Sequence, residues 1–177
     1  SGLGAPPLRL RQVHGNTVVR VVAVPPFAEE GDALVTDRPG LPLAIATADC
    51  VPVLLADPEA RVVGAVHAGW RGMRARVVLR AIEAMTALGA RPERIRAAIG
   101  PCVQGSCYEV GAEVRAAFEE SFPDATALFD GRRLDLVRAA RAEIAGAGVA
   151  EALVSSLDLC THCEPGLASY RREGSAR

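Results

Sequence analysis

Lysine is absent from this sequence of 177 residues, and all 20 of its basic side chains are arginine. Without lysine the printed chain forms no Schiff base with a carbonyl substrate, which excludes ordinary pyridoxal-phosphate catalysis as well as the lysine of a nucleotide-binding P-loop. Arginine instead offers bidentate hydrogen bonding to phosphate and carboxylate groups. The net charge of -1 gives no electrostatic reason to expect a nucleic acid or an anionic membrane as a partner.

Long apolar runs and signal-peptide features are also missing. No stretch reaches the roughly 18 consecutive apolar residues of a membrane span, and the first residues lack the basic and apolar regions of a secretory signal. We therefore expect a cytoplasmic protein. Five cysteines are an odd number in a chain that is not small, so we do not expect a disulfide scaffold. The thiols are interpreted as core residues, metal ligands or a nucleophile.

The composition is that of a globular domain, because half of the residues are hydrophobic and 23% are charged. The length suits a single domain over residues 1–177. Apolar runs of strand length alternate with helical patterns, so we expect an α+β or layered α/β fold with a β-sheet core flanked by helices.

The first part of the chain is expected to form a hairpin of residues 8–14 and 17–24 through Gly15-Asn16, with His14 exposed at the tip and Pro25-Pro26 ending the second strand. The tail from Tyr170 is polar and is expected to fray. Further expected elements are, in chain order, a strand at 31–36, a helix at 70–88, a strand at 96–99, helices at 113–122 and 134–147, and a strand at 152–157.

Residues 45–72 carry the strongest functional signal. Two apolar runs of strand length flank a turn at residues 57–60, Cys50 precedes the first run and His67 ends the second. If the runs pair as a hairpin, Cys50 and His67 meet at one edge of the sheet. His67 is followed by Ala-Gly-Trp-Arg-Gly, which begins a helical pattern. A thiol, an imidazole and an arginine therefore converge.

His14, Cys50 and His67 are the candidate metal ligands. Two imidazoles and one thiolate are a usual ligand set for catalytic zinc, which keeps a fourth position open. Taken singly, a histidine or cysteine is more often a packed core residue, so only the three residues together indicate a metal site. Cys50 and His67 also fit a thiolate nucleophile with an imidazole base, and Asp49 is a candidate for orienting the histidine. The residues alone leave ligand and nucleophile both open.

Arg71 lies in the first turn of the expected helix, where a phosphate or carboxylate would also meet free backbone N–H groups. An ordinary surface arginine is the alternative. We group Asn16 and His162 with Arg71 as candidate substrate- or phosphate-binding residues. The role of the remaining cysteines stays open between loop packing, which we favour, a structural zinc site and a redox pair; they are Cys102, Cys107, Cys160 and Cys163.

Several motifs together resemble one bacterial family, and the resemblance runs in order from about residue 8 to residue 174. They are Gln12-Val13-His14-Gly15, Asp32-Ala33-Leu34-Val35-Thr36, Thr47-Ala48-Asp49-Cys50, His67-Ala68-Gly69-Trp70-Arg71-Gly72, Ile99-Gly100-Pro101-Cys102, Tyr108-Glu109-Val110-Gly111, Cys160-Thr161 with Cys163, and Ser169-Tyr170-Arg171-Arg172. The chain resembles the multicopper-polyphenol-oxidase-like family, whose members are described as laccase-like, as peptidoglycan editing factors and as purine nucleoside phosphorylases.

The resemblance implies a layered α/β fold similar to that of putative cysteine hydrolases, and a zinc ion held by His14, Cys50 and His67. It also implies phosphorolysis of adenosine, inosine and guanosine, cleavage of methylthioadenosine, and deamination of adenosine. Purine nucleosides and phosphate are then the expected partners, with no nucleic acid, no membrane and an undetermined oligomeric state. Only about eleven residues precede Gln12, so we expect the chain to be short at its N-terminus relative to the family.

Three alternatives to this function remain. A Cys–His hydrolase acting on amide bonds of cell-wall precursors uses the same Cys50 and His67. A copper-dependent polyphenol oxidase needs many more histidines than the three in the sequence, so copper is expected less than zinc. A non-enzymatic metal-binding protein is the third alternative.

Overall fold

The computed structural model describes residues 6–24 and 29–174, which form a mixed α/β fold around a six-stranded sheet of order β1-β2-β4-β3-β5-β8. The strands of this sheet are β1 (Val18–Arg20), β2 (Ala33–Thr36), β3 (Val51–Asp57), β4 (Val62–Ala68), β5 (Arg96–Ile99) and β8 (Val154–Ser156). A small separate hairpin consists of β6 (Phe129–Asp130) and β7 (Arg133–Leu134). The helices are α1 (Trp70–Arg74), α2 (Val77–Ala87), α3 (Ala112–Glu119), α4 (Leu136–Gly146) and α5 (Tyr170–Glu173). The expected fold class is confirmed.

The central hairpin forms as predicted, with β3 and β4 antiparallel and Val51 opposite Ala68. Residues of β3 alternate between buried and at least partly exposed, because one face of the sheet is covered and the other is more open over this strand. Val53 is fully buried, whereas Leu54 is half-exposed. The predicted strand at 96–99 is also confirmed and pairs with the other edge of β3.

Asp57 ends β3 and fixes the turn of this hairpin. Its Oδ1 accepts hydrogen bonds from the backbone N–H groups of Glu59 and Ala60, both at 3.0 Å. Its Oδ2 accepts from the N–H of Arg91 at 2.9 Å and from the guanidinium of Arg94 at 2.9 Å. Burial alone would raise the pKa of Asp57, but these donors lower it to about 2. The carboxylate therefore stays ionised and holds the turn closed.

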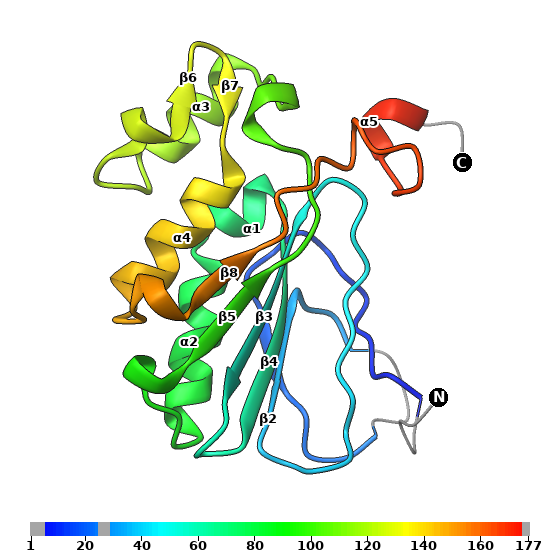
Figure 1. Cartoon of the computed structure of the whole chain (residues 1–177), viewed down its shortest axis with the longest axis vertical. Helices are drawn as coiled ribbons and strands as arrows, with labels where there is room; N and C mark the ends of the chain where they lie inside the picture. The colour runs from blue at the N-terminus through cyan, green and yellow to red at the C-terminus, as the bar shows by residue number, and fades with distance from the viewer. Residues whose placement is uncertain (1–5, 25–28, 175–177) are drawn as a thin grey trace.

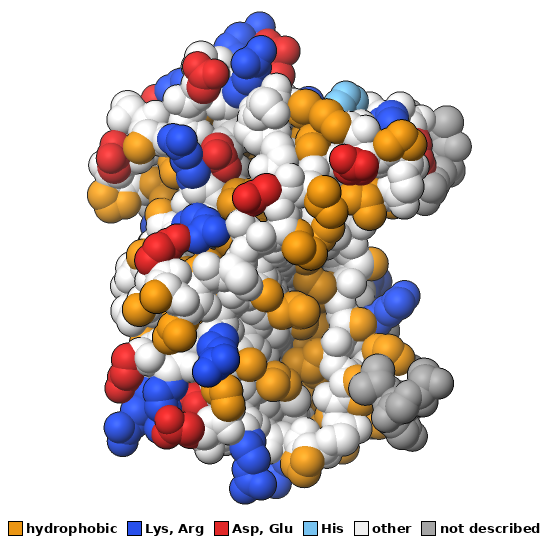
Figure 2. All heavy atoms as spheres, in the orientation of Figure 1, with side chains coloured by type: hydrophobic (Ala, Val, Ile, Leu, Met, Phe, Trp, Pro, Cys, Tyr) orange, Lys and Arg blue, Asp and Glu red, His pale blue; other side chains and the backbone are white. Residues whose placement is uncertain are grey.

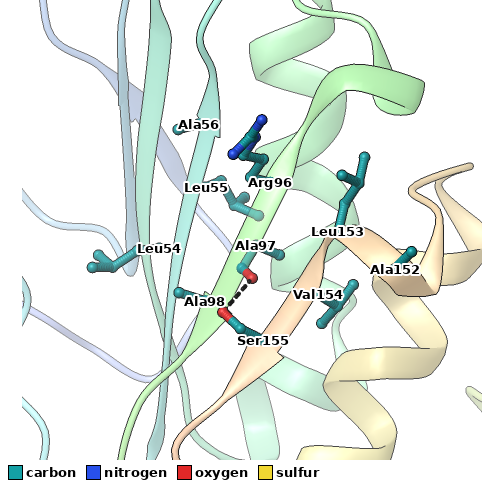
Figure 3. Close-up of a pocket in the computed structure, with 10 residues that line it drawn as sticks. All are labelled: Leu54, Leu55, Ala56, Arg96, Ala97, Ala98, Ala152, Leu153, Val154 and Ser155. Carbon is teal, nitrogen blue, oxygen red and sulfur yellow. Dashed lines mark hydrogen bonds between the residues drawn. The ribbon is translucent and has the colours of Figure 1, made fainter.

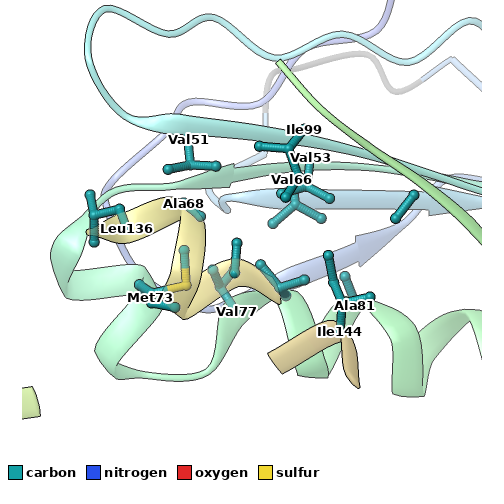
Figure 4. Packing of buried hydrophobic residues seen from close by; sticks show 14 of the residues in the cluster. Val51, Val53, Val66, Ala68, Met73, Val77, Ala81, Ile99, Leu136 and Ile144 are labelled. Carbon is teal, nitrogen blue, oxygen red and sulfur yellow. The ribbon is translucent and has the colours of Figure 1, made fainter. Parts of the chain in front are cut away.

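The core lies between the sheet and the layer of α2 and α4, which cover one face (Figure 1). Figure 4 shows Val53 and Val66 of the central hairpin pointing toward the side of Val77 and Ala81 on α2 and Ile144 on α4. All five side chains are buried, and apolar burial of this kind supplies the main stabilising free energy of the domain.

The opposite face of the sheet is only partly covered. Residues 8–10 and 41–45 pack over β1 and β2, but Leu54 and Leu157 remain more than half exposed. A hollow of about 390 Å³ lies over β3, β5 and β8, where Ser155 Oγ donates to the carbonyl of Ala97 at 3.3 Å (Figure 3). Figure 2 shows hydrophobic side chains gathered where this view of the surface is hollowed. The hollow contains one charged side chain, Arg96, and brings no titratable pair together.

The predicted N-terminal hairpin is wrong. Residues 8–14 form no strand in the described chain, only isolated bridges such as Leu8 with Leu43, and β1 pairs in parallel with β2. The chain at His14 and Gly15 turns because both backbone N–H groups donate to the carboxylate of Asp32, at 2.9 and 2.6 Å. A distant carboxylate therefore replaces the cross-strand bonds of a hairpin. The expected stop at Pro25-Pro26 lies outside the described residues.

The predicted single helix over 70–88 is also wrong, because the structure divides it into α1 and α2. Arg76 between them adopts the left-handed region, with φ of 64°. Two contacts stabilise the break between the helices. The side-chain amide of Asn16 donates to the carbonyl of Ala75 at 2.9 Å, and the Arg76 guanidinium lies 4.7 Å from the Phe122 ring centroid. The short α1 is therefore a separate helix that follows the end of β4.

The remaining predicted helices and the last strand lie within three residues of their expected bounds. The predicted fraying of the tail is wrong for residues 170–174, while residues 175–177 lie outside the described chain. Ser169 caps α5 by accepting the N–H of Arg172, whose guanidinium donates to the carbonyl of Thr161. Within the described residues no helix is long and apolar enough to cross a membrane.

Glu143 is a buried carboxyl group between α4 and the start of α2. Its Oε2 accepts the N–H of Leu79 at 2.9 Å, and its Oε1 has no hydrogen-bond partner among the described residues. Burial raises the pKa of Glu143 to about 7, against the opposing effect of the Leu79 N–H and the Arg76 charge. Between pH 4.5 and 7 the folded protein therefore retains a proton that the unfolded chain loses.

Replacing Glu143 with glutamine is expected to stabilise the protein at pH 8 by about 2–3 kcal/mol and to have little effect at pH 4.5. The reason is that the folded state binds more protons than the unfolded state between pH 4.5 and 7, so the wild type loses stability as the pH rises through this window. Urea unfolding at several pH values measures this difference. Glu83→Gln, on the exposed face of α2, is the control and should change little. A Glu143→Gln effect independent of pH would contradict the account.

Candidate metal and substrate site

Three segments bring His14, Cys50 and His67 together at one end of the sheet. His14 lies in the loop before β1, Cys50 directly before β3, and His67 near the end of β4, opposite Pro52. One ligand atom from each lies within 4.8 Å of the other two. The two imidazole rings meet edge to face, with centroids 4.8 Å apart. His67 is buried, Cys50 is half-buried and His14 is exposed, so the group opens to the surface on the His14 side.

The carboxylate of Asp32 organises this group from behind. It is fully buried and accepts the N–H groups of Val13, His14 and Gly15 at 3.4, 2.9 and 2.6 Å. Its Oδ1 also lies 2.8 Å from Nδ1 of His67. Because Nδ1–H donates to a carboxylate, Nε2 of His67 is left without a proton and is available as a ligand or acceptor.

His14 adopts a backbone conformation that L-residues seldom occupy, with φ of 60°. Such strain persists only where the surroundings fix it, and here the N–H of His14 and that of Gly15 are both held by Asp32. The strained turn is what directs His14 toward the other two residues.

Two glycines allow α1 to approach the three residues. A Cβ on Gly69 would lie 2.9 Å from Cδ2 of His14 and 3.0 Å from the sulfur of Cys50. A Cβ on Gly72 would lie 2.7 Å from the carbonyl oxygen of Gly15. The glycines around Trp70 and Arg71 are therefore required by packing against the site, since any larger residue would displace it.

The protonation of the site favours metal binding over an activated thiol. Burial, together with the negative charges of Asp49 and Asp32, raises the pKa of Cys50 to about 11. Burial lowers the pKa of His67, although its bond to Asp32 opposes this. A neutral imidazole is a good ligand, whereas the thiol becomes a thiolate at neutral pH only beside a cation. Two imidazoles and a thiol in this state fit a soft divalent metal ion with one position left open.

A cavity of about 690 Å³ opens beside these residues. Its aromatic walls are Trp70, Tyr108 and Tyr170, and Arg171 is its cationic side chain. The Arg171 guanidinium lies 4.5 Å from the Tyr108 ring centroid. The lining consists of Gln12, His14, Ala46, Ala48, Asp49, Cys50, His67, Trp70, Tyr108, Tyr170, Arg171 and Gly174. Burial raises the pKa of Tyr108 to about 12, so its phenol stays neutral.

Asp49 does not orient a histidine, so that interpretation is wrong. Its Oδ1 accepts the hydroxyl of Thr161 at 2.7 Å, and its Oδ2 accepts the N–H of Arg171 at 2.8 Å. Asp49 thereby attaches the C-terminal segment to the cavity wall. The orienting carboxylate is Asp32, which the sequence analysis did not single out. Its signal was a carboxylate directly before a strand, Ala33–Thr36, whose residues are all buried, because a carboxylate buried there requires several donors.

The structure does not bring the other three predicted residues into the described lining. Arg71 is exposed, and its guanidinium lies 4.4 Å from the ring centroid of Trp70. The side-chain amide of Asn16 donates a hydrogen bond to the carbonyl of Ala75, which follows α1. His162 lies in the loop after β8, and its buried Nδ1 has no partner among the described residues.

Comparison with known proteins gives a consistent result. Residues 2–177 match the family model described as multi-copper polyphenol oxidoreductase laccase. A purine nucleoside phosphorylase of Deinococcus radiodurans is 52% identical over 167 residues, which cover 93% of this chain and 64% of that protein. The chain therefore spans just under two thirds of this relative. Purine nucleoside phosphorylase ORF3 of Streptomyces griseus is 45% identical over 93% of this chain and 68% of its own length.

Solved structures agree with the sequence matches. YlmD of Geobacillus stearothermophilus superposes with a TM-score of 0.85 at 31% identity, covering 94% of this chain and 68% of that one. The hypothetical protein YfiH of Bacillus licheniformis gives a TM-score of 0.87 at 29% identity, with the same coverage of both chains. Sequence and fold thus point to one family.

Replacing Asp32 with asparagine is expected to lower the free energy of unfolding by about 2–4 kcal/mol. One carbonyl oxygen would replace two carboxylate oxygens, so the amide nitrogen would face the N–H donors of residues 13–15 or of His67. Urea unfolding measures the loss. Asp130→Asn is the matched control, because that carboxylate is 91% exposed. Equal stability of the two variants would show that Asp32 does not hold the site.

Proposed function

The chain belongs to the multi-copper polyphenol oxidoreductase laccase family, and from its site we propose that it is a zinc-dependent purine nucleoside phosphorylase. The reaction converts adenosine, inosine, guanosine or methylthioadenosine and phosphate into the free base and a ribose 1-phosphate. The observation that carries the proposal is the position of His14, Cys50 and His67 beside an aromatic cavity that also contains one arginine. The names of the relatives support the same class of enzyme.

The cavity suits a nucleoside in size and in chemistry. Its volume of about 690 Å³ lies within the range of small-molecule sites. Trp70, Tyr108 and Tyr170 offer ring faces and edges against which a purine packs. The neutral Tyr108 phenol and the side chain of Gln12 provide hydrogen-bonding groups for the ribose or the base.

Phosphate binding is assigned to Arg171 within this proposal. Arg171 lines the cavity, and a guanidinium binds phosphate through paired hydrogen bonds. Its position is fixed at three points: its N–H donates to Asp49, its guanidinium donates to the carbonyl of Glu109 at 2.7 Å, and the same group lies against Tyr108. Arg71 remains an outer anion-binding residue of the proposal, since it contacts the Trp70 wall from the exposed side.

His14, Cys50 and His67 would hold the zinc ion, and Asp32 would keep the Nε2 atom of His67 directed at it. A zinc ion with an open position supplies Lewis acidity toward a phosphate or water oxygen. The protein contributes the orientation of the nucleoside against its aromatic walls and the charge of Arg171 on the phosphate. Deamination of adenosine by water, giving inosine and ammonia, is the accompanying activity of the same proposal.

The alternatives have less support from the site. A Cys–His hydrolase needs a thiolate, whereas the pKa of Cys50 is about 11 because of burial and two nearby carboxylates. A copper oxidase needs several histidine ligands, and the sequence contains three histidines, of which two lie at this site.

Replacing Cys50 with serine is expected to reduce phosphorolysis at least 100-fold, because the zinc site loses its thiolate ligand. The measurement is product analysis of adenosine and inosine with phosphate, by separation of the base from the nucleoside. Cys102→Ala is the matched control, since Cys102 is buried in the core and is not among the residues that line the cavity. Dialysis against a chelator should abolish turnover, and added zinc should restore it. Unchanged turnover in Cys50→Ser, or turnover that survives chelation, would refute the proposal.

Replacing Arg171 with alanine is expected to raise the KM for phosphate by about 10- to 100-fold while leaving the KM for the nucleoside within a few-fold. Arg171→Lys should recover part of the loss, because it restores the charge without the planar fork. Arg71→Ala is the comparison, and its effect should be smaller because Arg71 lies outside the cavity lining. Steady-state kinetics at varied phosphate concentration measures the KM for phosphate in each variant. A larger increase in Arg71→Ala than in Arg171→Ala would assign phosphate binding to Arg71.

A further inference from the structure

A second group of thiols lies outside the cavity lining. The sulfurs of Cys107, Cys160 and Cys163 lie within 4.8 Å of one another, and those of Cys107 and Cys163 are 3.4 Å apart. Cys107 ends the short turn of residues 105–107, whereas the other two belong to the loop after β8. The fold therefore joins two segments that are more than 50 residues apart in the sequence.

Backbone N–H groups surround the first sulfur of the Cys160-Thr161-His162-Cys163 loop. The N–H of Gln104 donates to Cys160 Sγ at 3.4 Å, and the N–H groups of His162 and Cys163 also face this sulfur. Three sulfurs therefore lie together, and one of them faces several N–H donors.

We propose that Cys107, Cys160 and Cys163 bind a thiophilic divalent cation such as zinc, with solvent in the fourth position. A tetrahedral zinc ion with Zn–S bonds of about 2.3 Å separates its sulfurs by about 3.8 Å. The sulfurs of Cys107 and Cys163 are 3.4 Å apart and all three lie within 4.8 Å of one another, so three thiolates reach one ion with small side-chain movements. Cys163 is exposed, which leaves one side of the cluster open to water.

Two nearby groups lie outside the set of ligands. Cys102 is bridged to Cys160 through the backbone, but its buried sulfur accepts the side-chain amide of Gln104 at 3.6 Å. His162 stands between two ligands, yet neither Cys102 nor His162 has a ligand atom within 4.8 Å of all three sulfurs. The site is therefore a three-cysteine site, and Cys102 is a control within the same loops.

The cation would fasten the loop that carries the C-terminal wall of the cavity. The hydroxyl of Thr161, between the ligands, donates to Asp49, and its carbonyl accepts the guanidinium of Arg172. Arg172 is adjacent to Arg171, which lines the cavity. A metal ion joining Cys107 to residues 160–163 therefore holds this wall against the loop at residues 102–107. The role is structural, and it is independent of His14, Cys50 and His67.

Zinc stoichiometry tests the proposal. The full chain is incubated with excess zinc under a non-thiol reductant, freed of unbound metal by gel filtration, and analysed for metal and protein. We expect two zinc ions per chain in the wild type and in Cys102→Ala, and one in either Cys163→Ser or Cys50→Ser. The double variant Cys50→Ser with Cys163→Ser should bind none. In Cys50→Ser, cobalt bound in place of zinc should give the intense thiolate-to-metal absorption of a three-sulfur site.

Two results would overturn the proposal. One is a wild type that binds a single zinc ion, retained in Cys163→Ser and lost in Cys50→Ser. The other is a Cys107–Cys163 disulfide that persists under the reductant and accompanies binding of one zinc ion. Neither result argues against the proposed zinc site at His14, Cys50 and His67. That site would instead be contradicted if zinc were lost on replacing Cys163 but not on replacing Cys50. The two proposals therefore fail separately.

Discussion

The site depends on one buried carboxylate, that of Asp32. A buried charge is costly unless it is fully hydrogen-bonded, and here three backbone N–H groups of residues 13–15 and the imidazole of His67 satisfy it. These bonds join the N-terminal loop to β4. They also impose the strained backbone of His14 and the tautomer of His67, so that one interaction sets the positions of two of the three candidate ligands.

The sheet and its glycines supply the rest of the geometry. Pairing of β3 with β4 places Cys50 beside His67, and Asp57 closes the far end of this hairpin. Gly69 lets the first turn after β4 pass close to His14 and Cys50, which excludes a side chain at that position. The cavity wall is completed by the C-terminal segment, which Asp49 anchors. Elements from both ends of the chain therefore meet at one end of the sheet.

Much of this arrangement could be predicted from local pattern. The two apolar runs and their turn predict the hairpin, and with it the meeting of Cys50 and His67. Features that depend on distant contacts were not predictable in this way. Asp32 adjoins a strand without polar alternation, and the break at Arg76 has no glycine to signal it. Arg171 lies in a polar tail that contacts with Asp49, Glu109 and Tyr108 make part of the site. In each case the deciding partner is far away in the sequence.

In the proposed zinc site, Asp32 holds His67 and the strained His14 loop so that these two histidines and Cys50 bind one zinc ion. The most direct test is a crystal structure of the zinc-loaded protein with anomalous diffraction measured at the zinc absorption edge. We expect an anomalous peak bonded to His14, Cys50 and Nε2 of His67, with Nδ1 of His67 still hydrogen-bonded to Asp32. Zinc bound without Cys50, or a His67 turned away from Asp32, would contradict this expectation.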